Sequence, residues 1–308
     1  MQYLYTIAGI EILLDIPFTV EIKEDSLEFL RPVEIIKEKT EPVRNLIVVE
    51  LLPKDKVTVN EDEGIRVDSR REVQERQDKK IYIYNYSNIP YACLEMQANR
   101  IICRYLEKYS SLLKDSQKLF NLLGMEAIFL KKKTFILHSS FIRWKGDGIL
   151  FTAPSGYGKS TQAALWETYE HAEILNGDRA AINRQGEEWY AHGMPYAGTS
   201  GIYRNECAPV RVAFVIRKAM QNRVRRLTLP EAVRYLYSEV TVHQWDEEFV
   251  NEIMNLLMEF AAQVPVYYLE CLPDESAVEL AKRVLEAEKE KEKNGWKQIQ
   301  DQHLSRNI

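Results

Sequence analysis

The nine residues from Ala153 to Thr161, APSGYGKST, constrain the fold of this chain more than any other segment. An apolar run typical of a strand, GILFTA (148–153), leads into them, and a run typical of a helix, STQAALWETY (160–169), continues from them. A strand, a glycine-containing turn and a helix that begins at Gly-Lys-Ser are together typical of a phosphate-binding loop. The segment therefore predicts an α/β core in which this turn binds the phosphates of a nucleotide.

Each residue type in this loop has a physical role in binding phosphate. Gly156 and Gly158 permit backbone conformations closed to other residues, so that successive N–H groups can point at phosphate oxygens. We expect Lys159 to reach the β- and γ-phosphates of ATP and Ser160 to offer its hydroxyl to Mg²⁺. The helix that starts here directs the positive end of its dipole at the anion. The predicted nucleotide contacts are Ser155, Gly156, Tyr157, Gly158, Lys159, Ser160 and Thr161.

The loop departs from the strict pattern GxxxxGK[ST] at its first position, where Ala153 stands for glycine. We expect alanine at this position to affect phosphate binding little, because the residues from 155 onward form the phosphate cradle. The later strand VRVAFVI (210–216) ends at Arg217, a weaker candidate for a phosphate contact, and Arg204 lies in a stretch that could cover the site. Salt-bridged or solvated arginines are the alternative interpretation of both.

A nucleotide site also needs a carboxylate that holds the metal or accepts a proton. Asp178, at the end of EILNGD (173–178), is the best candidate, and it follows Lys159 by only 19 residues. That separation is shorter than in most large NTPases. Because Asn-Gly-Asp is also favourable turn chemistry, a plain turn residue is the alternative interpretation of Asp178.

The order of these segments resembles the HPr kinase/phosphorylase family, which shares its nucleotide-binding core with phosphoenolpyruvate carboxykinases. The resemblance covers about residues 133–285, and its specific parts are His138, SGYGKS at 155–160, and Asp178. It implies a P-loop kinase core of that type in which Lys159 and Ser160 bind the triphosphate and Mg²⁺, Asp178 is a second metal ligand, and His138 lies beside the γ-phosphate. A hydrogen-bonded strand histidine is the other interpretation of His138.

One position departs from the family pattern. The family has two adjacent aspartates, and the first takes the proton of the acceptor hydroxyl, whereas here Gly177 precedes Asp178. Either Asp178 or His138 accepts the proton instead, or phosphoryl transfer relies on positioning and charge neutralisation. The remaining alternative is a protein that binds nucleotide without efficient catalysis.

These patterns predict an ATP- and Mg²⁺-dependent kinase that transfers a phosphoryl group to a hydroxyl, most plausibly a serine of a small protein or peptide. The stretch from His192 to Asn222 also resembles related kinases of bacterial peptide-modification gene clusters, in agreement with a peptide acceptor. The rival class is a nucleotide-binding regulatory or scaffold protein with little or no catalysis. A third interpretation is a phosphorylase or phosphatase that runs the same chemistry backward.

The chain divides into three predicted parts. Residues 1–130 form a smaller β-rich domain for substrate selection or homo-oligomer assembly, with an amphipathic helix predicted over 116–130. Residues 131–288, where strands and helices alternate, form the catalytic domain. Residues 289–308 form a polar C-terminal tail that we expect to be frayed.

Composition excludes other function classes. A net charge of −5 argues against a dedicated nucleic-acid binder. No apolar run approaches the roughly 18 residues that would cross a bilayer. The four cysteines are scattered without metal-site spacing, which favours reduced thiols in a cytoplasmic protein.

Overall fold

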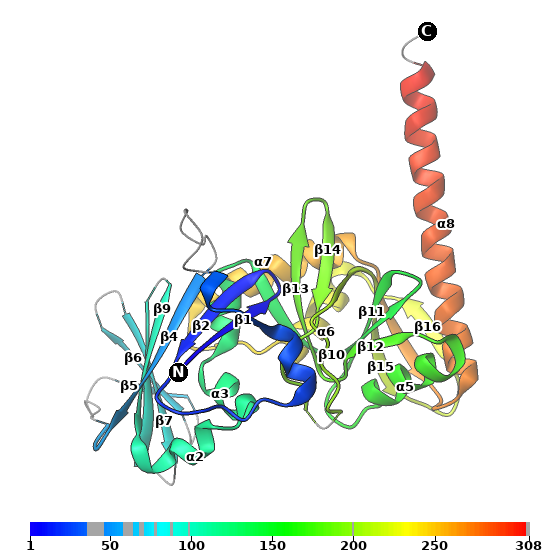
Figure 1. Ribbon diagram of the computed structural model, residues 1–308. Helices are drawn as coiled ribbons and strands as arrows, with labels where there is room; N and C mark the ends of the chain where they lie inside the picture. Colours follow the sequence, from blue (N-terminus) through cyan, green and yellow to red (C-terminus); the bar gives the residue numbers. More distant parts are fainter. Residues whose placement is uncertain are drawn as a thin grey trace.

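The computed structural model describes residues 1–35, 46–57, 64–67, 71–76, 79–86, 89–97, 99–198 and 200–305. These residues form a mixed α/β structure around two large sheets, which lie side by side in Figure 1. The sequence prediction of an α/β protein with a β-rich N-terminal part agrees with this architecture. The predicted boundary at residue 130 stays a prediction.

The first sheet comprises strands from the N-terminal third of the chain. Its order is β3-β1-β2-β4-β9-β8-β7-β6-β5. The strands are β1 (Gln2–Ile7), β2 (Ile10–Asp15), β3 (Leu30–Arg31), β4 (Leu46–Lys54), β5 (Gly64–Arg66), β6 (Arg71–Arg76), β7 (Lys79–Tyr86), β8 (Ile89–Met96) and β9 (Arg100–Leu106). Alternating burial, as in β2, shows that one face of this sheet packs on the core while the other is more exposed.

Short helices accompany this sheet. They are η1 (Glu24–Phe29), η2 (Glu107–Tyr109), α2 (Ser110–Leu113), α3 (Ser116–Leu122) and α4 (Met125–Leu130). The prediction of a single helix over 116–130 was wrong, because the chain breaks at Gly124, whose φ of 60° is left-handed. A glycine in that conformation commonly ends a helix, so the apolar residues on both sides are buried by two short helices instead of one.

The second sheet follows the order β11-β10-β13-β14-β15-β17-β16, with β12 paired to β10. The strands are β10 (Thr134–Trp144), β11 (Asp147–Thr152), β12 (Glu173–Asn176), β13 (Arg179–Gln185), β14 (Glu188–His192), β15 (Cys207–Lys218), β16 (Arg223–Arg226) and β17 (Val266–Cys271). Strand β11 also pairs in parallel with β15. The pairings of β11, β10, β13, β14 and β15 therefore close into a ring.

Four longer helices pack around the second sheet. They are α5 (Lys159–Glu170), α6 (Leu229–Glu239), α7 (Glu247–Gln263) and α8 (Glu275–Ser305). The capping box that begins α6 joins Thr228 and Glu231. Helix α8 continues through the segment expected to be a polar tail, and its last part extends away from both sheets in Figure 1. None of the helices in the described ranges is long and apolar enough to cross a membrane.

Aromatic side chains fill the core on both sides of the second sheet. Trp166 of α5 is fully buried and packs edge-on against Trp144 of β10. On the side of the first sheet, Phe120 contacts Tyr5 of β1 and stacks on Tyr196 at a ring distance of 5.8 Å. One hydrophobic cluster thus extends across both sheets, which holds the N-terminal part against the segment that contains Tyr196.

Candidate active site

Strand β10 brings the predicted site residues together. On one side, Ser139 pairs with Thr152, the last residue of β11 before the glycine-rich loop. On the other side, His138 lies opposite Arg179, the first residue of β13 and the neighbour of Asp178. Neighbouring residues of β10 thus lie next to the loop and next to the Asp178 turn. His138 and Asp178, which are 40 positions apart in sequence, are therefore close together in the fold.

The glycine-rich loop, residues 153–158, contains two glycines with positive φ. Gly156 and Gly158 have φ angles of 82° and 104°, in the region where glycine avoids the steric cost of a Cβ. Gly158 is the N-cap of α5, so the free N–H groups of the first helical turn open onto the loop. An anion placed there would meet unpaired donors and the positive end of the helix dipole.

Lys159 is folded back onto this loop. Its ammonium donates to the carbonyl oxygens of Ala153, at 2.7 Å, and Pro154, at 3.3 Å, and the residue is 6% exposed. Burial lowers the pKa of Lys159, while the charges of Glu239 and Asp178 act in the opposite direction. A buried ammonium that is hydrogen-bonded to neutral carbonyls would gain strongly from an arriving phosphate.

The turn that carries Asp178 is ordered by the buried side chain of Asn176. Its amide oxygen accepts from the backbone N–H groups of Asp178 and Arg179, both at 2.9 Å. Its amide nitrogen donates to the carbonyl oxygens of Met194 and Tyr196. The Asn-Gly-Asp turn predicted as one alternative is present, and Asn176 fixes its position within the core.

Two serine hydroxyls connect this turn to the strand and to the helix. Ser140 of β10 donates to the carbonyl oxygen of Gly177 at 2.9 Å, and Ser160 of α5 lies 3.4 Å from the same oxygen. Ser160 therefore lies next to the Asp178 turn.

Four ionisable side chains form a cluster at this point: His138, Lys159, Asp178 and Glu239. The His138 ring lies between two carboxylates, with Nε2 at 3.3 Å from Asp178 Oδ1 and Nδ1 at 3.2 Å from Glu239 Oε2. Arg179 is a further partner of Asp178, at 3.4 Å. His138 is thus a hydrogen-bonded strand histidine and at the same time a neighbour of the predicted metal ligand.

The contacts in this cluster shift the pKa values in opposite directions. Hydrogen bonds to Asp178 and Glu239 raise the pKa of His138, although burial acts against them. The bond from His138 lowers the pKa of Asp178, again against burial. The pair therefore favours an imidazolium next to a carboxylate over a wider pH range than either group would alone.

The segment between β14 and β15 forms a wall over the Asp178 turn. A Cβ added to Gly198 would lie 3.0 Å from Asp178 Cγ, so the backbone approaches the carboxyl group closely, and it also donates a hydrogen bond to it. A Cβ added to Gly177 would lie 2.3 Å from Ser200 Cβ and Oγ. Ser200 occupies the space that a side chain at 177 would need, so a second acid would not fit in this turn as it is arranged.

We expect Gly177→Ala to destabilise the protein by about 1–3 kcal/mol, because the added methyl group collides with Ser200 in a packed environment. The φ angle of Gly177 does not lie in the left-handed region. The expected loss of stability therefore comes from the steric clash and not from backbone strain. The double variant Gly177→Ala/Ser200→Gly should recover most of the loss. Urea unfolding of the three proteins measures both effects, and a single variant as stable as the parent would contradict this description of the wall.

The remaining predicted residues have different surroundings. Ser155 and Tyr157 are exposed on the loop, and Thr161 is exposed in the first turn of α5. Arg217 hydrogen-bonds Tyr268, and Arg204 pairs with Glu28 of η1 at 3.1 Å. Arg217 is therefore a hydrogen-bonded arginine and Arg204 a salt-bridged one in this structure.

Sequence reasoning missed two charged residues of the site. Glu239 follows His138 by 101 positions and ends α6, so no local pattern could connect them. Lys218, and not only its neighbour Arg217, approaches the loop, since its Cε lies 3.9 Å from a Cβ built on Gly158. The alternation of side chains along β15 was the available signal for Lys218.

A small cavity of about 110 Å³ opens beside the loop. It is lined by Tyr157, Gly158 and Thr161, and by Lys218 and Leu272, of which Lys218 ends β15 and Leu272 follows β17. The lining of this cavity combines an aromatic ring, a cation and apolar atoms.

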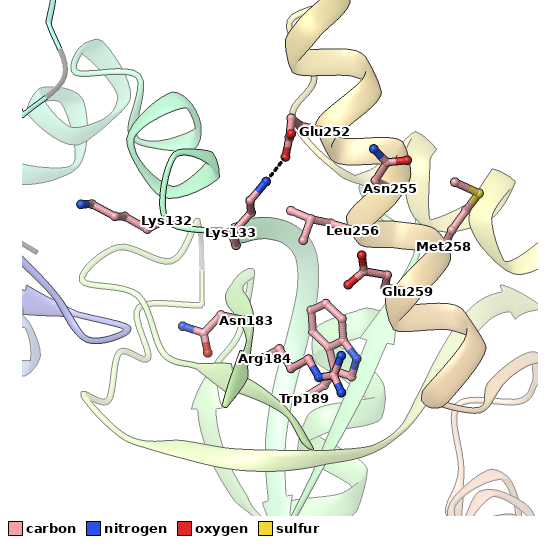
Figure 2. A pocket seen from close by; sticks show the side chains of 10 residues that line it. All are labelled: Lys132, Lys133, Asn183, Arg184, Trp189, Glu252, Asn255, Leu256, Met258 and Glu259. Atoms are coloured by element: carbon pink, nitrogen blue, oxygen red, sulfur yellow. Dashed lines mark hydrogen bonds and ion pairs between the residues drawn. The ribbon is translucent and has the colours of Figure 1, made fainter. Parts of the chain in front are cut away.

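A larger cavity, of about 560 Å³, lies apart from these residues, between α7, the β13–β14 hairpin and the turn at Lys132. Figure 2 shows Lys133 directed at Glu252 of α7, with Arg184 and Trp189 of the hairpin across from the same helix. Lys133 and Glu252 form an ion pair. None of the predicted site residues lines this cavity.

The donor set fits a nucleotide with a magnesium ion. Mg²⁺ prefers hard oxygen ligands, commonly one or two protein oxygens together with substrate phosphates and water. Ser160, whose hydroxyl lies 3.4 Å from the Gly177 carbonyl oxygen, and Asp178, the next residue after Gly177, could supply such oxygens. In the part of the chain that the structure describes, no group of three or more His, Cys, Asp or Glu residues could hold a metal without such a substrate.

Comparisons with known proteins add a distant structural likeness. No family model matches the chain, and no curated protein matches it either. Among solved structures, the HPr(Ser) kinase/phosphatase from Coxiella burnetii is similar at 12% identity and a TM-score of 0.32, covering 55% of this chain and 98% of its own. At that score the likeness carries no argument about function, which depends instead on the geometry of the site.

Proposed function

We propose that this protein is an ATP- and Mg²⁺-dependent phosphotransferase of HPr-kinase-like type, with a P-loop core, that phosphorylates a hydroxyl, most plausibly a serine, on a small protein or peptide. The observation that supports this most is the convergence of three segments. Lys159 and Ser160 follow the glycine-rich loop, Asp178 follows β12, and His138 comes from β10, yet their side chains lie around one turn.

In this proposal the loop backbone and the first turn of α5 bind the β- and γ-phosphates. Lys159 exchanges the Ala153 and Pro154 carbonyls for phosphate oxygens. Ser160 and Asp178 hold Mg²⁺, which would neutralise charge that develops on the transferred group. Lys218 and the adjoining cavity border the part of the nucleotide that extends beyond the phosphates.

The proton of the acceptor hydroxyl would go to the Asp178 carboxylate, because the raised pKa of His138 favours a ring that is already protonated. The His138 imidazolium, whose Nε2 lies 3.3 Å from Asp178 Oδ1, would hold that carboxylate in place. Glu239, on the far ring nitrogen of His138, orients the imidazole. This arrangement offers a proton acceptor without a carboxylate at position 177.

The rival proposal is a nucleotide-binding regulatory or scaffold protein. It is favoured by the same cluster, because Asp178 already has two cationic partners, His138 and Arg179, that compete with a metal ion. Transfer of label from γ-labelled ATP to serine-containing peptides separates the two. Nucleotide binding without transfer to any hydroxyl would favour the rival, and release of phosphate from phosphoserine would show the reverse reaction.

We expect Ser160→Ala to reduce the gain in ATP affinity that Mg²⁺ provides by about tenfold, because one oxygen ligand of the ion is lost, which corresponds to roughly 1.4 kcal/mol. ATP affinity without Mg²⁺ should change little. Titration calorimetry with and without Mg²⁺ measures both. Thr168→Ala, a hydroxyl variant near the other end of α5, is the control, and equal Mg²⁺ dependence in both variants would remove Ser160 as a ligand.

A further inference from the structure

The segment between β14 and β15, described at residues 193–198 and 200–206, contacts the Asp178 turn along one side. Tyr203 forms a β-bridge with Asn176, and the Arg204 N–H donates to the Leu175 carbonyl at 3.0 Å. Between these contacts and Pro195, the backbone of Gly198 lies against the carboxyl group of Asp178. The position of this segment therefore decides the surroundings of Asp178.

The other side of the same segment is held by the N-terminal part of the chain through η1. Ser26, which is 1% exposed, donates to the carbonyl of Pro195 at 2.9 Å. Lys23 Nζ lies 3.1 Å from the hydroxyl of Tyr203. Contacts thus exist at the start and near the end of the segment.

Glu28 makes the largest set of these contacts. Its carboxylate accepts from the Arg204 guanidinium and from the backbone N–H of Asn205, each at 3.1 Å. Its carbonyl accepts from the Asn205 side chain at 2.9 Å. A charged acceptor that holds both a side chain and a backbone N–H restricts the backbone more than a side-chain ion pair would.

We propose that Glu28, supported by Ser26, is a positioning residue that clamps the β14–β15 segment so that Gly198 stays against Asp178. This inference rests on the proposed function, and it assigns to the N-terminal part a direct role in the phosphoryl-transfer site. The clamp holds the segment on both sides of Gly198 and Ser200, so movement at either end would displace the wall over the Asp178 turn. The glycine-rich loop is anchored separately, by β11 and α5.

Because Glu28 does not hold the glycine-rich loop, a Glu28 variant can separate an effect on Asp178 from an effect on phosphate binding. Glu28→Ala should reduce the rate constant of transfer, kcat, by about tenfold while ATP affinity without Mg²⁺ stays the same, because Asp178 loses its alignment and the phosphate cradle does not. Glu28→Gln, which keeps one acceptor oxygen for the Asn205 N–H, should recover part of the loss. The matched control is Glu50→Ala, which breaks the exposed Arg100–Glu50 pair within the first sheet, far from this segment in sequence.

Hydrogen–deuterium exchange provides a readout besides activity. Amides of residues 200–206 should exchange at least several-fold faster in Glu28→Ala than in Glu50→Ala, and the Mg²⁺-dependent gain in ATP affinity should fall. Unchanged exchange, or a kcat equal to that of Glu50→Ala, would overturn the clamp. If the parent protein transfers no phosphate but exchange still responds to Glu28→Ala and Mg²⁺ dependence falls, the proposed function fails while the clamp stands.

Discussion

Replacing Lys159 with alanine should weaken ATP binding and reduce phosphoryl transfer by about 10²–10³-fold, the usual effect of losing one preorganised donor to a phosphate or an oxyanion. The ammonium is 6% exposed and already lies at the loop carbonyls. It therefore needs only a short movement to meet a phosphate, and its burial makes that contact strong. Titration calorimetry with ATP and a labelled-transfer assay measure the two losses.

The control for this variant is Lys282→Ala. Lys282 belongs to α8 and pairs with Glu170 at the opposite end of α5 from the loop. That substitution also removes a lysine that contacts α5, but it leaves the loop untouched. If Lys159→Ala binds ATP as tightly as Lys282→Ala does, the glycine-rich loop does not bind phosphate, and the proposed function has lost its basis.

Asp178→Asn should reduce transfer by about 10²–10⁴-fold, the range typical for the loss of a group that moves a proton. Asparagine has nearly the same shape, so the close approach of Gly198 is retained. What changes is the negative charge, which is proposed to hold Mg²⁺ and which faces His138 at 3.3 Å. Transfer that survives undiminished would remove Asp178 from the mechanism, and His138→Ala then tests the other member of the pair.

The same variant changes how stability depends on pH. The pKa of Asp178 is lowered from 3.8, so its contribution to stability is present above that pH and is lost as the pH falls through the folded value. The pKa of His138 is raised from 6.5, so its contribution is present below that pH and is lost as the pH rises through the folded value. The difference between parent and Asp178→Asn in urea unfolding should be largest between about pH 4 and 6.5. A difference independent of pH would contradict the ion pair.

Particular residues show where sequence reasoning was sufficient. The loop from Ala153 to Gly158 and the helix after it follow local rules, because glycine freedom and helix capping depend on residues a few positions apart. The helix predicted after the loop is α5, and the apolar run predicted before the loop is β11. The expected helix over 116–130 was wrong at Gly124, where one residue in a left-handed conformation divided a regular apolar pattern.

The site itself depended on long-range packing. Glu239 and Glu28 come from elements far from the loop in sequence, and neither lies within a recognisable motif. Gly177 looked like a missing acid, whereas the structure shows Ser200 in the space that its side chain would require. Such steric exclusions arise only when segments distant in the chain meet.

The sequence by itself determined the chemistry available at one turn: two glycines, Lys159, Ser160 and a nearby carboxylate. Only the tertiary structure decided which groups surround that turn, because the pairings of β10 place His138 beside Asp178 and the β14–β15 segment closes over it. Backbone conformation is local and can be derived from neighbouring residues. Burial, charge pairing and the pKa values that follow from them depend on contacts between distant segments, and these contacts exist only in the folded chain.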